Sequence, residues 1–255
     1  MNAQYWITHF EENSRRALTL PDEPCTLPDA IRDPLARSLA VFQLGESGGG
    51  TRLRRYARKV APMERFRGYQ RALDLFVAEE QGHSDLLGIV VDHLGGTRIA
   101  RQWSNSVFRS LRVLVNLEFN IQVLLTAELI AEVYYGTLHL RCADSVVRAM
   151  ARKILRDEMK HLRFQREFLS ERVGTFSEME QRMWEAQFRV IHRVTSWVVA
   201  WDHRACLRAI GSSPAQFRRA SSDAMERFMR RFRASVREAV DSRRLREERS
   251  VLEAA

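Results

Sequence analysis

The stretches EEQGH at residues 79–83 and DEMKH at residues 157–161 decide the fold and the candidate site of this 255-residue chain. Each contains a Glu-x-x-His spacing, and residues three apart lie on the same face of an α-helix. Each stretch therefore offers one carboxylate and one imidazole, a combination that suits iron, manganese or zinc. An acid also precedes each glutamate, and metal-bound histidines usually donate their second N–H to such a carboxylate. The doubled pattern predicts two half-sites for transition metals.

Two single glutamates, Glu46 and Glu128, each precede one of these motifs. The intervals are 34 residues from Glu46 to Glu80, 48 from Glu80 to Glu128 and 30 from Glu128 to Glu158. The first and last intervals suit a helix, a short turn and an antiparallel return, and the middle one suits a crossover connection. This order of Glu, Glu-x-x-His, Glu, Glu-x-x-His resembles the ferritin-like di-iron carboxylate proteins, whose four-helix bundles hold two metals between facing helices. The resemblance covers roughly residues 34 to 170.

The resemblance implies a dinuclear site with two iron ions, or one iron and one manganese, and O₂ as co-substrate. Glu79 and Asp157 would orient the ligand histidines across the site. Glu132 lies four residues after Glu128 on the same helical face, so either could be the third-helix ligand, or Glu132 could be an extra carboxylate near the cluster. The implied ligands are Glu46, Glu80, His83, Glu128, Glu158 and His161.

The sequence around Glu46 allows two interpretations. The apolar residues Leu35, Leu39 and Phe42 lead to it at helical spacing, which predicts that it lies on a buried face. However, Gly45 and the glycines at 48–50 are unfavourable in a helix interior, each by about 0.8 to 1 kcal/mol relative to alanine. A loop at 45–50 with a solvated Glu46 is therefore the alternative to a distorted helix beside the metals.

The remaining pattern predicts an all-α protein in three parts: an irregular, proline-punctuated arm at 1–30, a ferritin-like four-helix bundle at 31–175 and a helical extension with a basic tail at 176–255. Bundle helices are expected at about 34–53, from Pro62 to the glycines at 95–96, at 108–141 and from an Asp144 cap onward. In the extension, a capping box at 177–180 should begin a tryptophan-rich helix that ends near Gly211. We expect its tryptophans to pack between bundle and extension. The Arg-rich last segment, 218–249, should form a solvated amphipathic helix that frays.

Composition bears on where the protein is located and which partners it binds. Apolar stretches are too short to cross a bilayer, and the N-terminus has no secretory signal pattern, so we expect a soluble protein. Three scattered cysteines form no C-x-x-C pair and favour a reducing cytoplasm. The net charge of +9 favours acidic partners such as a substrate carrier protein, nucleic acid or anionic lipid. No nucleic-acid-binding signature supports the second of these.

The leading functional hypothesis is a non-haem di-iron oxidase or oxygenase that uses O₂ for hydroxylation, desaturation or N-oxygenation of a small or carrier-bound organic substrate. The motifs look particularly like those of soluble acyl-carrier desaturases and related oxygenases. Ile154 stands where some N-oxygenases carry an additional histidine. Electrons would come from a separate reductase or ferredoxin, and we leave a homodimer open. The alternatives are a ferroxidase or iron-storage protein without organic substrate and a bundle whose cluster is only structural.

Overall fold

The computed structural model describes residues 1–16, 18–48, 50–60, 63, 66–102 and 117–254, and the described part is all-helical. The helices are α1 (Ala3–Ser14), α2 (Asp29–Glu46), α3 (Thr51–Val60), α4 (Tyr69–His93), α6 (Leu117–Arg141), α7 (Ser145–Val173), α8 (Glu178–Asp202), α9 (Arg204–Ala209) and α10 (Pro214–Ala254). No helix in these ranges has an apolar run of the length and purity that a bilayer crossing requires.

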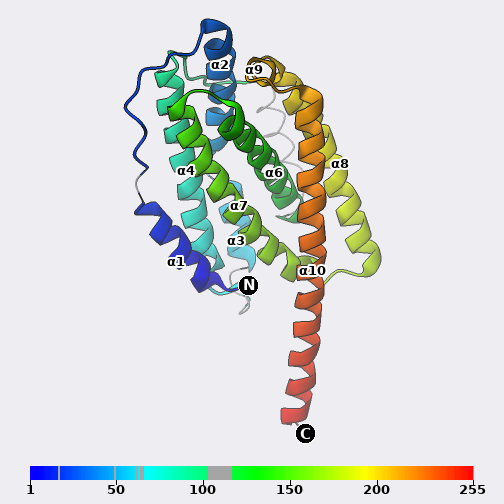
Figure 1. Cartoon of the computed structure of the whole chain (residues 1–255). Helices are drawn as coiled ribbons and strands as arrows, with labels where there is room; N and C mark the ends of the chain where they lie inside the picture. Colours follow the sequence, from blue (N-terminus) through cyan, green and yellow to red (C-terminus); the bar gives the residue numbers. More distant parts are fainter. Residues whose placement is uncertain (17, 49, 61–62, 64–65, 103–116, 255) are drawn as a thin grey trace.

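Four stretches form the central bundle: α2 continued by α3, then α4, α6 and α7 (Figure 1). Helix α2 packs along α4, α6 packs along α7, and α4 contacts α7 between them. Helices α8 and α10 lie on the outer side of α6, and α1 lies across α4. The two motif-bearing helices therefore face each other across the interior.

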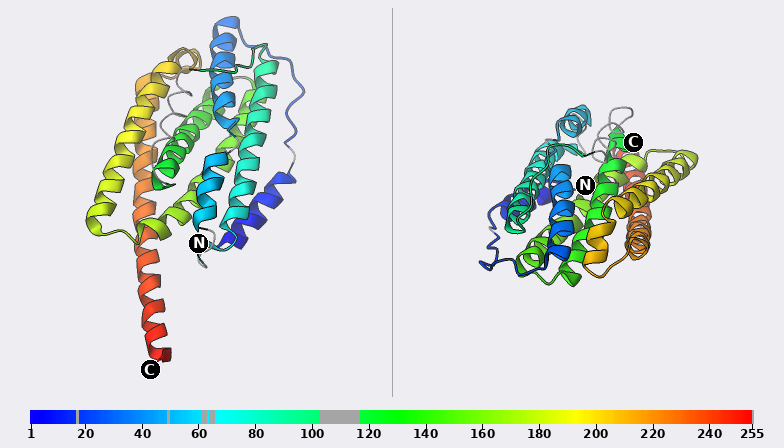
Figure 2. Two further views of the ribbon diagram at one scale, coloured as in Figure 1. Left: turned by 180° about the vertical axis from the view of Figure 1, so that it is seen from behind. Right: turned by 90° about the horizontal axis from the view of Figure 1, so that it is seen from above.

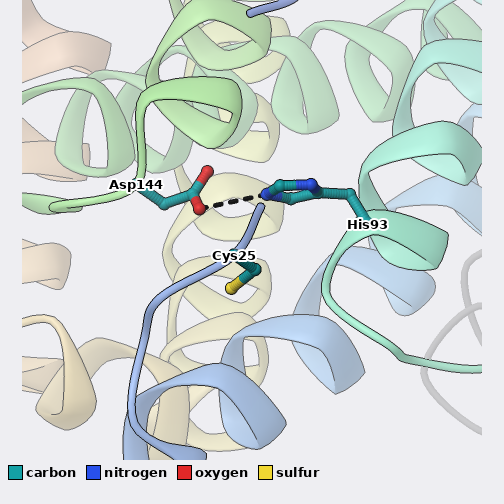
Figure 3. A group of neighbouring side chains, drawn as sticks. All are labelled: Cys25, His93 and Asp144. Atoms are coloured by element: carbon teal, nitrogen blue, oxygen red, sulfur yellow. Dashed lines mark hydrogen bonds and ion pairs between the residues drawn. The ribbon is translucent and has the colours of Figure 1, made fainter. Parts of the chain in front are cut away.

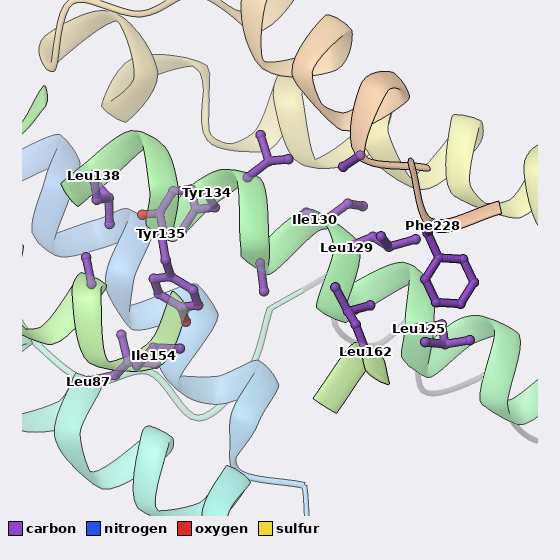
Figure 4. Close-up of a cluster of buried hydrophobic side chains, with 14 of the residues drawn as sticks. Leu87, Leu125, Leu129, Ile130, Tyr134, Tyr135, Leu138, Ile154, Leu162 and Phe228 are labelled. Carbon is purple, nitrogen blue, oxygen red and sulfur yellow. The ribbon is translucent and has the colours of Figure 1, made fainter. Parts of the chain in front are cut away.

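The bundle is held together by a continuous apolar core. Figure 4 shows part of it, where Leu87 of α4, Ile154 of α7 and Tyr135 of α6 meet, while Phe228 of α10 covers Leu125 of α6. These side chains are almost fully buried. Burying one leucine or isoleucine contributes roughly 1.5 to 3 kcal/mol. The same core fixes the rotation of α4 and α7, and so the direction of their polar residues.

Helix boundaries follow local signals in the sequence. The side chain of Asp144 accepts a hydrogen bond from the Val147 amide at 2.9 Å and begins α7, which confirms the expected cap. The capping box of Ser177 and Glu180 begins α8, also as predicted. Helix α8 ends at Asp202, earlier than expected, and the short α9 then continues to the turn at Gly211, whose φ is 72°.

The structure corrects the expected start of the second bundle helix. We placed it at Pro62, which lies outside the described residues, but α4 begins at Tyr69. Gly68 precedes it with φ 82°, a left-handed conformation that cannot continue a right-handed helix. The expected beginning of the third bundle helix, at 108–116, also lies outside the described residues.

We expected an irregular arm at residues 1–30, but its first part is the helix α1. Asn2 caps α1 by accepting a hydrogen bond from the Tyr5 amide, and the three prolines of the arm all come after residue 20. Trp6 and Phe10 of α1 are buried, and the Trp6 indole donates to Glu167 at 2.7 Å. Helix α1 is therefore part of the packed structure.

The C-terminal extension also differs from expectation. Trp184 is buried, but Trp197 and Trp201 are 57% and 64% exposed, so the prediction that the tryptophans form core is wrong for these two. The last segment is helical to Ala254, and its final turns project beyond the bundle (Figures 1 and 2). Helix α10 packs through apolar residues as far as Ala239 and has an exposed, arginine-rich surface beyond it.

Candidate metal centre

The two Glu-x-x-His motifs meet inside the bundle. Glu80 and His83 project from α4 and Glu158 and His161 from α7, and both imidazoles and Glu158 are at most 2% exposed. His161 Nδ1 lies 2.9 Å from Glu80 Oε1 and 3.6 Å from Glu158 Oε2. His83 Nδ1 lies 3.6 Å from Glu158 Oε1 and 3.9 Å from Glu80 Oε1. Each imidazole therefore faces the glutamate of the opposite helix as well as its own.

The outer nitrogens of both histidines bind carboxylates that come from the opposite helix. His83 Nε2 lies 2.9 Å from Asp157 Oδ2, and His161 Nε2 lies 2.7 Å from Glu79 Oε2. A hydrogen bond from Nε2–H to a carboxylate leaves the Nδ1 lone pair of a neutral imidazole facing inward, as a metal ligand requires. These contacts have the crossed arrangement expected from the sequence. That the histidines bind metal stays a prediction.

Two further side chains support the outer carboxylates, and sequence reasoning missed both. The Asn13 amide of α1 donates to Glu79 and, at 3.1 Å, to Asp157 Oδ1, so it links the two acids. The Lys153 ammonium pairs with Asp157 from one turn earlier on α7. The i, i+4 spacing of Lys153 and Asp157 could have revealed the second contact. No local pattern could have revealed Asn13, because its partners are 66 and 144 residues away.

Glu46 joins the group from the last turn of α2. One donor atom each from Glu46, Glu80, His83 and Glu158 lies within 4.8 Å of the others. Helix α2 includes Glu46 and ends there. The glycines at 48 and 50 therefore lie after the candidate ligand, in the break between α2 and the start of α3 at Thr51. The phenol of Tyr135 on α6 donates to Glu46 Oε1 at 3.5 Å, a contact that sequence reasoning did not anticipate.

The two α6 candidates lie in different places. Glu128 is buried, at 2% exposure, but it is not among the four residues whose donor atoms converge. Glu132 forms an ion pair with Arg227 of α10 at 3.2 Å. Residues four apart on a helix differ in direction by about 40°, and the contact with Arg227 places the Glu132 carboxylate beside α10. The structure therefore does not bring Glu132 to the cluster, and the role of Glu128 stays a prediction.

The protonation of the cluster follows from burial and crowding. Burial, together with the nearby carboxylates of Glu80 and Glu158, raises the pKa of Glu46 well above its usual value. Burial alone would raise the pKa of Glu80 and lower that of His83, but the charged partners of each group have the larger, opposite effect. The close contact with His161 and the charges of both imidazoles lower the pKa of Glu80 to about 2. The carboxylates of Asp157 and Glu158 raise the pKa of His83 to about 9. The crowded carboxylates are therefore stabilised by positive charge in the space between them.

The inner atoms of the cluster fit a metal ion. Nδ1 of His83, Nδ1 of His161, Oε1 of Glu80 and Oε2 of Glu158 are buried and make no hydrogen bond within the described part of the chain. A buried polar atom without a partner typically costs about 1 to 3 kcal/mol. Four such atoms of metal-ligand type, directed toward one another, would all be satisfied by coordination. Phe76 packs edge-on to His161 at 4.7 Å between ring centroids, which adds an apolar wall to the site.

Comparison of the sequence with models of known protein families finds no match, and a comparison with curated proteins finds none either.

Proposed function

We propose that this chain is a ferritin-like di-iron carboxylate enzyme that activates O₂ to oxidise an organic substrate. The observation that carries the proposal is the pair of crossed contacts, in which each motif histidine binds the acid of the opposite motif through Nε2 and directs Nδ1 inward. A core histidine that is held by one hydrogen bond through Nε2 does not require carboxylates of two helices beside its Nδ1 as well. The antiparallel pair of α6 and α7 and the neighbouring α2 and α4 are consistent with such a bundle.

The residues would divide between two metals. Glu46, Glu80 and His83 would hold one ion, and Glu128, Glu158 and His161 the other. Glu80 and Glu158 each lie within 3.9 Å of the Nδ1 atoms of both imidazoles and would supply carboxylate oxygen ligands. Bound iron in its reduced form would supply the electrons that O₂ activation requires.

The protein's own groups would prepare and protect this chemistry. Asp157 and Glu79 hold the protons on the Nε2 atoms and so fix which nitrogen is available. Asn13 holds both acids in place at once. Phe10 and Phe76 lie beside the His161 ring and help exclude water from that side of the cluster. A dry, rigid surrounding strengthens each charge interaction within it.

We further propose that electrons come from a separate reductase or ferredoxin and that the substrate is a small molecule or one carried by an acidic carrier protein. The support is the net charge of +9. The buried acids of the cluster are counted in this value but are not exposed, so the surface is more positive than the net charge indicates. Positive surface charge accelerates association with acidic partners at low ionic strength.

The test is anaerobic Fe²⁺ titration followed by exposure to O₂. The native protein should bind two irons per chain and then form an oxidised species without taking up more iron. Glu80→Ala and His161→Ala should abolish the reaction with O₂, because each removes a ligand from a different helix. Glu128→Ala and Glu132→Ala form a matched pair on α6, and only the first should lower the iron stoichiometry.

Three results would contradict the proposal. Retention of tens of iron ions per chain would indicate iron storage. Full O₂ reactivity in the His161→Ala protein would show that this cluster is not the reaction site. Failure of the native protein to bind iron, with folding intact, would leave the cluster a structural hydrogen-bond network.

A further inference from the structure

A second group of metal-ligand side chains lies at the end of the bundle where α4 ends and α7 begins. It consists of Cys25 in the arm between α1 and α2, His93 in the last turn of α4, and Asp144 at the N-cap of α7 (Figure 3). One donor atom from each lies within 4.8 Å of the other two, and His93 Nε2 is 3.0 Å from Asp144 Oδ2. No member belongs to the carboxylate cluster.

The donor set and its spacing suit zinc. A thiolate, an imidazole and a carboxylate are the three side-chain ligands that Zn²⁺ takes, with sulfur at about 2.3 Å and nitrogen or oxygen at about 2.0 to 2.2 Å. In a tetrahedral site those lengths place ligand atoms roughly 3.3 to 3.7 Å apart. The observed spacing brackets this range, so side-chain adjustments of less than about 1.5 Å would complete the geometry. Cys25 and His93 are partly exposed, which leaves a position open for water.

The surroundings hold these three residues in place. Asp144 uses Oδ1 to cap α7, which leaves Oδ2 directed at His93. Two residues before Cys25, Glu23 accepts a hydrogen bond from the Ser145 hydroxyl at 2.6 Å, which fastens the arm beside the same cap. The Asp144 carboxylate, fixed by its helix cap, has already lost much of its conformational freedom, and the contact of Glu23 holds the arm close to it. The entropic cost of assembling a site is correspondingly small.

We propose that Cys25, His93 and Asp144 bind a zinc ion that fastens the arm to the adjoining ends of α4 and α7. The arm connects to α1, whose Asn13 contacts both outer acids of the carboxylate cluster. The bound ion stabilises the folded state in proportion to the logarithm of its concentration over its Kd.

Cobalt substitution tests this site separately from the carboxylate cluster, because only a site with a cysteine ligand gives a thiolate-to-cobalt absorption band. Reduced native protein titrated with Co²⁺ should develop that band, and Zn²⁺ should remove it by displacement. Cys25→Ser should abolish the band, and Cys206→Ser, which alters a buried thiol of α9, should keep it. Asp144→Asn retains a capping side chain, so it should stay folded while its Zn²⁺ Kd rises at least tenfold.

The readout separates failure of this proposal from failure of the iron proposal, since the latter site has no sulfur ligand. Absence of the thiolate band in native protein, or the same band in Cys25→Ser, would overturn the zinc site whatever the result of iron titration. An equal increase in thermal stability with Zn²⁺ in native protein and in Cys25→Ser would overturn it as well.

An independent observation concerns the outer face of α8. This face carries six large apolar side chains at helical spacing, each between 57% and 66% exposed, while the opposite face is buried through Trp184 and Phe188. The stripe is about 33 Å long by the rise of an α-helix. Exposed apolar side chains gathered along one helical face are typical of an interaction site, and the guanidinium groups of Arg218 and Arg204 lie over the rings of Trp197 and Trp201 at its C-terminal end. The stripe consists of Met179, Met183, Val190, Val194, Trp197 and Trp201.

The size and charge of the stripe favour a second copy of the chain as its occupant. Six such side chains expose roughly 700 Å², close to the approximately 800 Å² that each partner contributes to a standard interface. The two ends of α8 differ in charge: Glu178 and Glu180 lie exposed in its first turn, and Arg204 and Arg208 follow its last. Antiparallel packing across a two-fold axis near Val190 places each acidic end opposite the basic end of the other copy.

We propose that α8 packs antiparallel against α8 of a second copy. Sedimentation equilibrium should give twice the chain mass of 29.7 kDa. Val190→Lys places two cations at the axis and should shift the protein to monomer, whereas Leu245→Lys, at an equally exposed apolar position on α10, should leave the dimer intact. A monomeric native protein at tens of micromolar would overturn this assignment, as would a Val190→Lys dimer. Binding of monomer to anionic vesicles through the same stripe would assign it to a membrane surface instead.

Discussion

The replacement Asp157→Asn tests the crossed arrangement of the carboxylate cluster most directly. Asp157 makes three contacts: with the His83 imidazole at 2.9 Å, with the Lys153 ammonium and with the Asn13 amide. An asparagine has nearly the same shape and can still accept from His83 Nε2–H, but the bond is no longer charge-assisted. A hydrogen bond to a charged group contributes about 1.5 to 3 kcal/mol and a neutral one about 0.5 to 1.5 kcal/mol.

The difference between these two bonds, about 1 to 1.5 kcal/mol, sets the minimum effect on metal affinity. Loss of the negative charge also makes Nδ1 a weaker base, and removing such an outer partner typically lowers metal affinity 10- to 100-fold. The metal held by His83 should therefore bind 10- to 100-fold more weakly in Asp157→Asn. The metal held by His161 should keep its affinity, because its outer partner is Glu79.

The assay is an anaerobic Fe²⁺ titration against a chromophoric chelator, fitted to two sites per chain. One dissociation constant should rise and the other stay unchanged, and Glu79→Gln should give the mirror result. Asp92→Asn is the matched control, because Asp92 lies on α4 but pairs with exposed Arg98. Asn13→Ala removes the donor common to both acids and should weaken both sites. Native dissociation constants in Asp157→Asn, with unchanged circular dichroism, would refute the crossed arrangement as a determinant of metal binding.

Three further outcomes are expected. Glu46→Ala should lower iron stoichiometry with helical content unchanged, and two normally bound irons would show that another acid completes the site. Ile154→Ala should lower the free energy of unfolding by about 2 to 5 kcal/mol in urea, because Ile154 is fully buried in the bundle core. Burial lowers the pKa values of His192 and His203 to about 4, so each group favours the folded state above its unfolded pKa of about 6.5 and loses that contribution as the pH falls toward 4. His192→Leu should flatten this acid-side loss in thermal unfolding between pH 7 and 4.

Local signals in the sequence were sufficient for most of the helix assignments and for the facing motifs. The Asp144 cap, the capping box at 177–180 and the i, i+3 spacing of each motif all operate within one helical turn. Glu128 and Glu132 could not be separated in this way. Both fit the same periodic face, and packing separates them: Glu128 is buried, whereas Glu132 pairs with Arg227, 95 residues later.

The tryptophans of α8 show that helical periodicity does not identify which apolar face of a helix is buried. Trp184 and Trp197 belong to one apolar-rich helix, yet the first lies in the core and the second carries the Arg218 guanidinium over its ring at 3.3 Å to the centroid. The helix has apolar residues on two faces, so periodicity alone could not show which face α6 and α10 cover. Only the packing of those neighbours decides it.

The two adjacent acids of each motif point in different directions, so one serves its own half-site and the other contacts the histidine of the opposite helix. Successive residues on a helix differ in direction by about 100°, so Glu80 points into the cluster while Glu79 reaches around the side to the histidine of the other helix. Asp157 and Glu158 do the same from α7. Each helix thus carries a candidate ligand for one metal and the orienting acid for the other. A rotation of either helix would therefore disturb the ligands of one half-site and the orienting acid of the other at the same time.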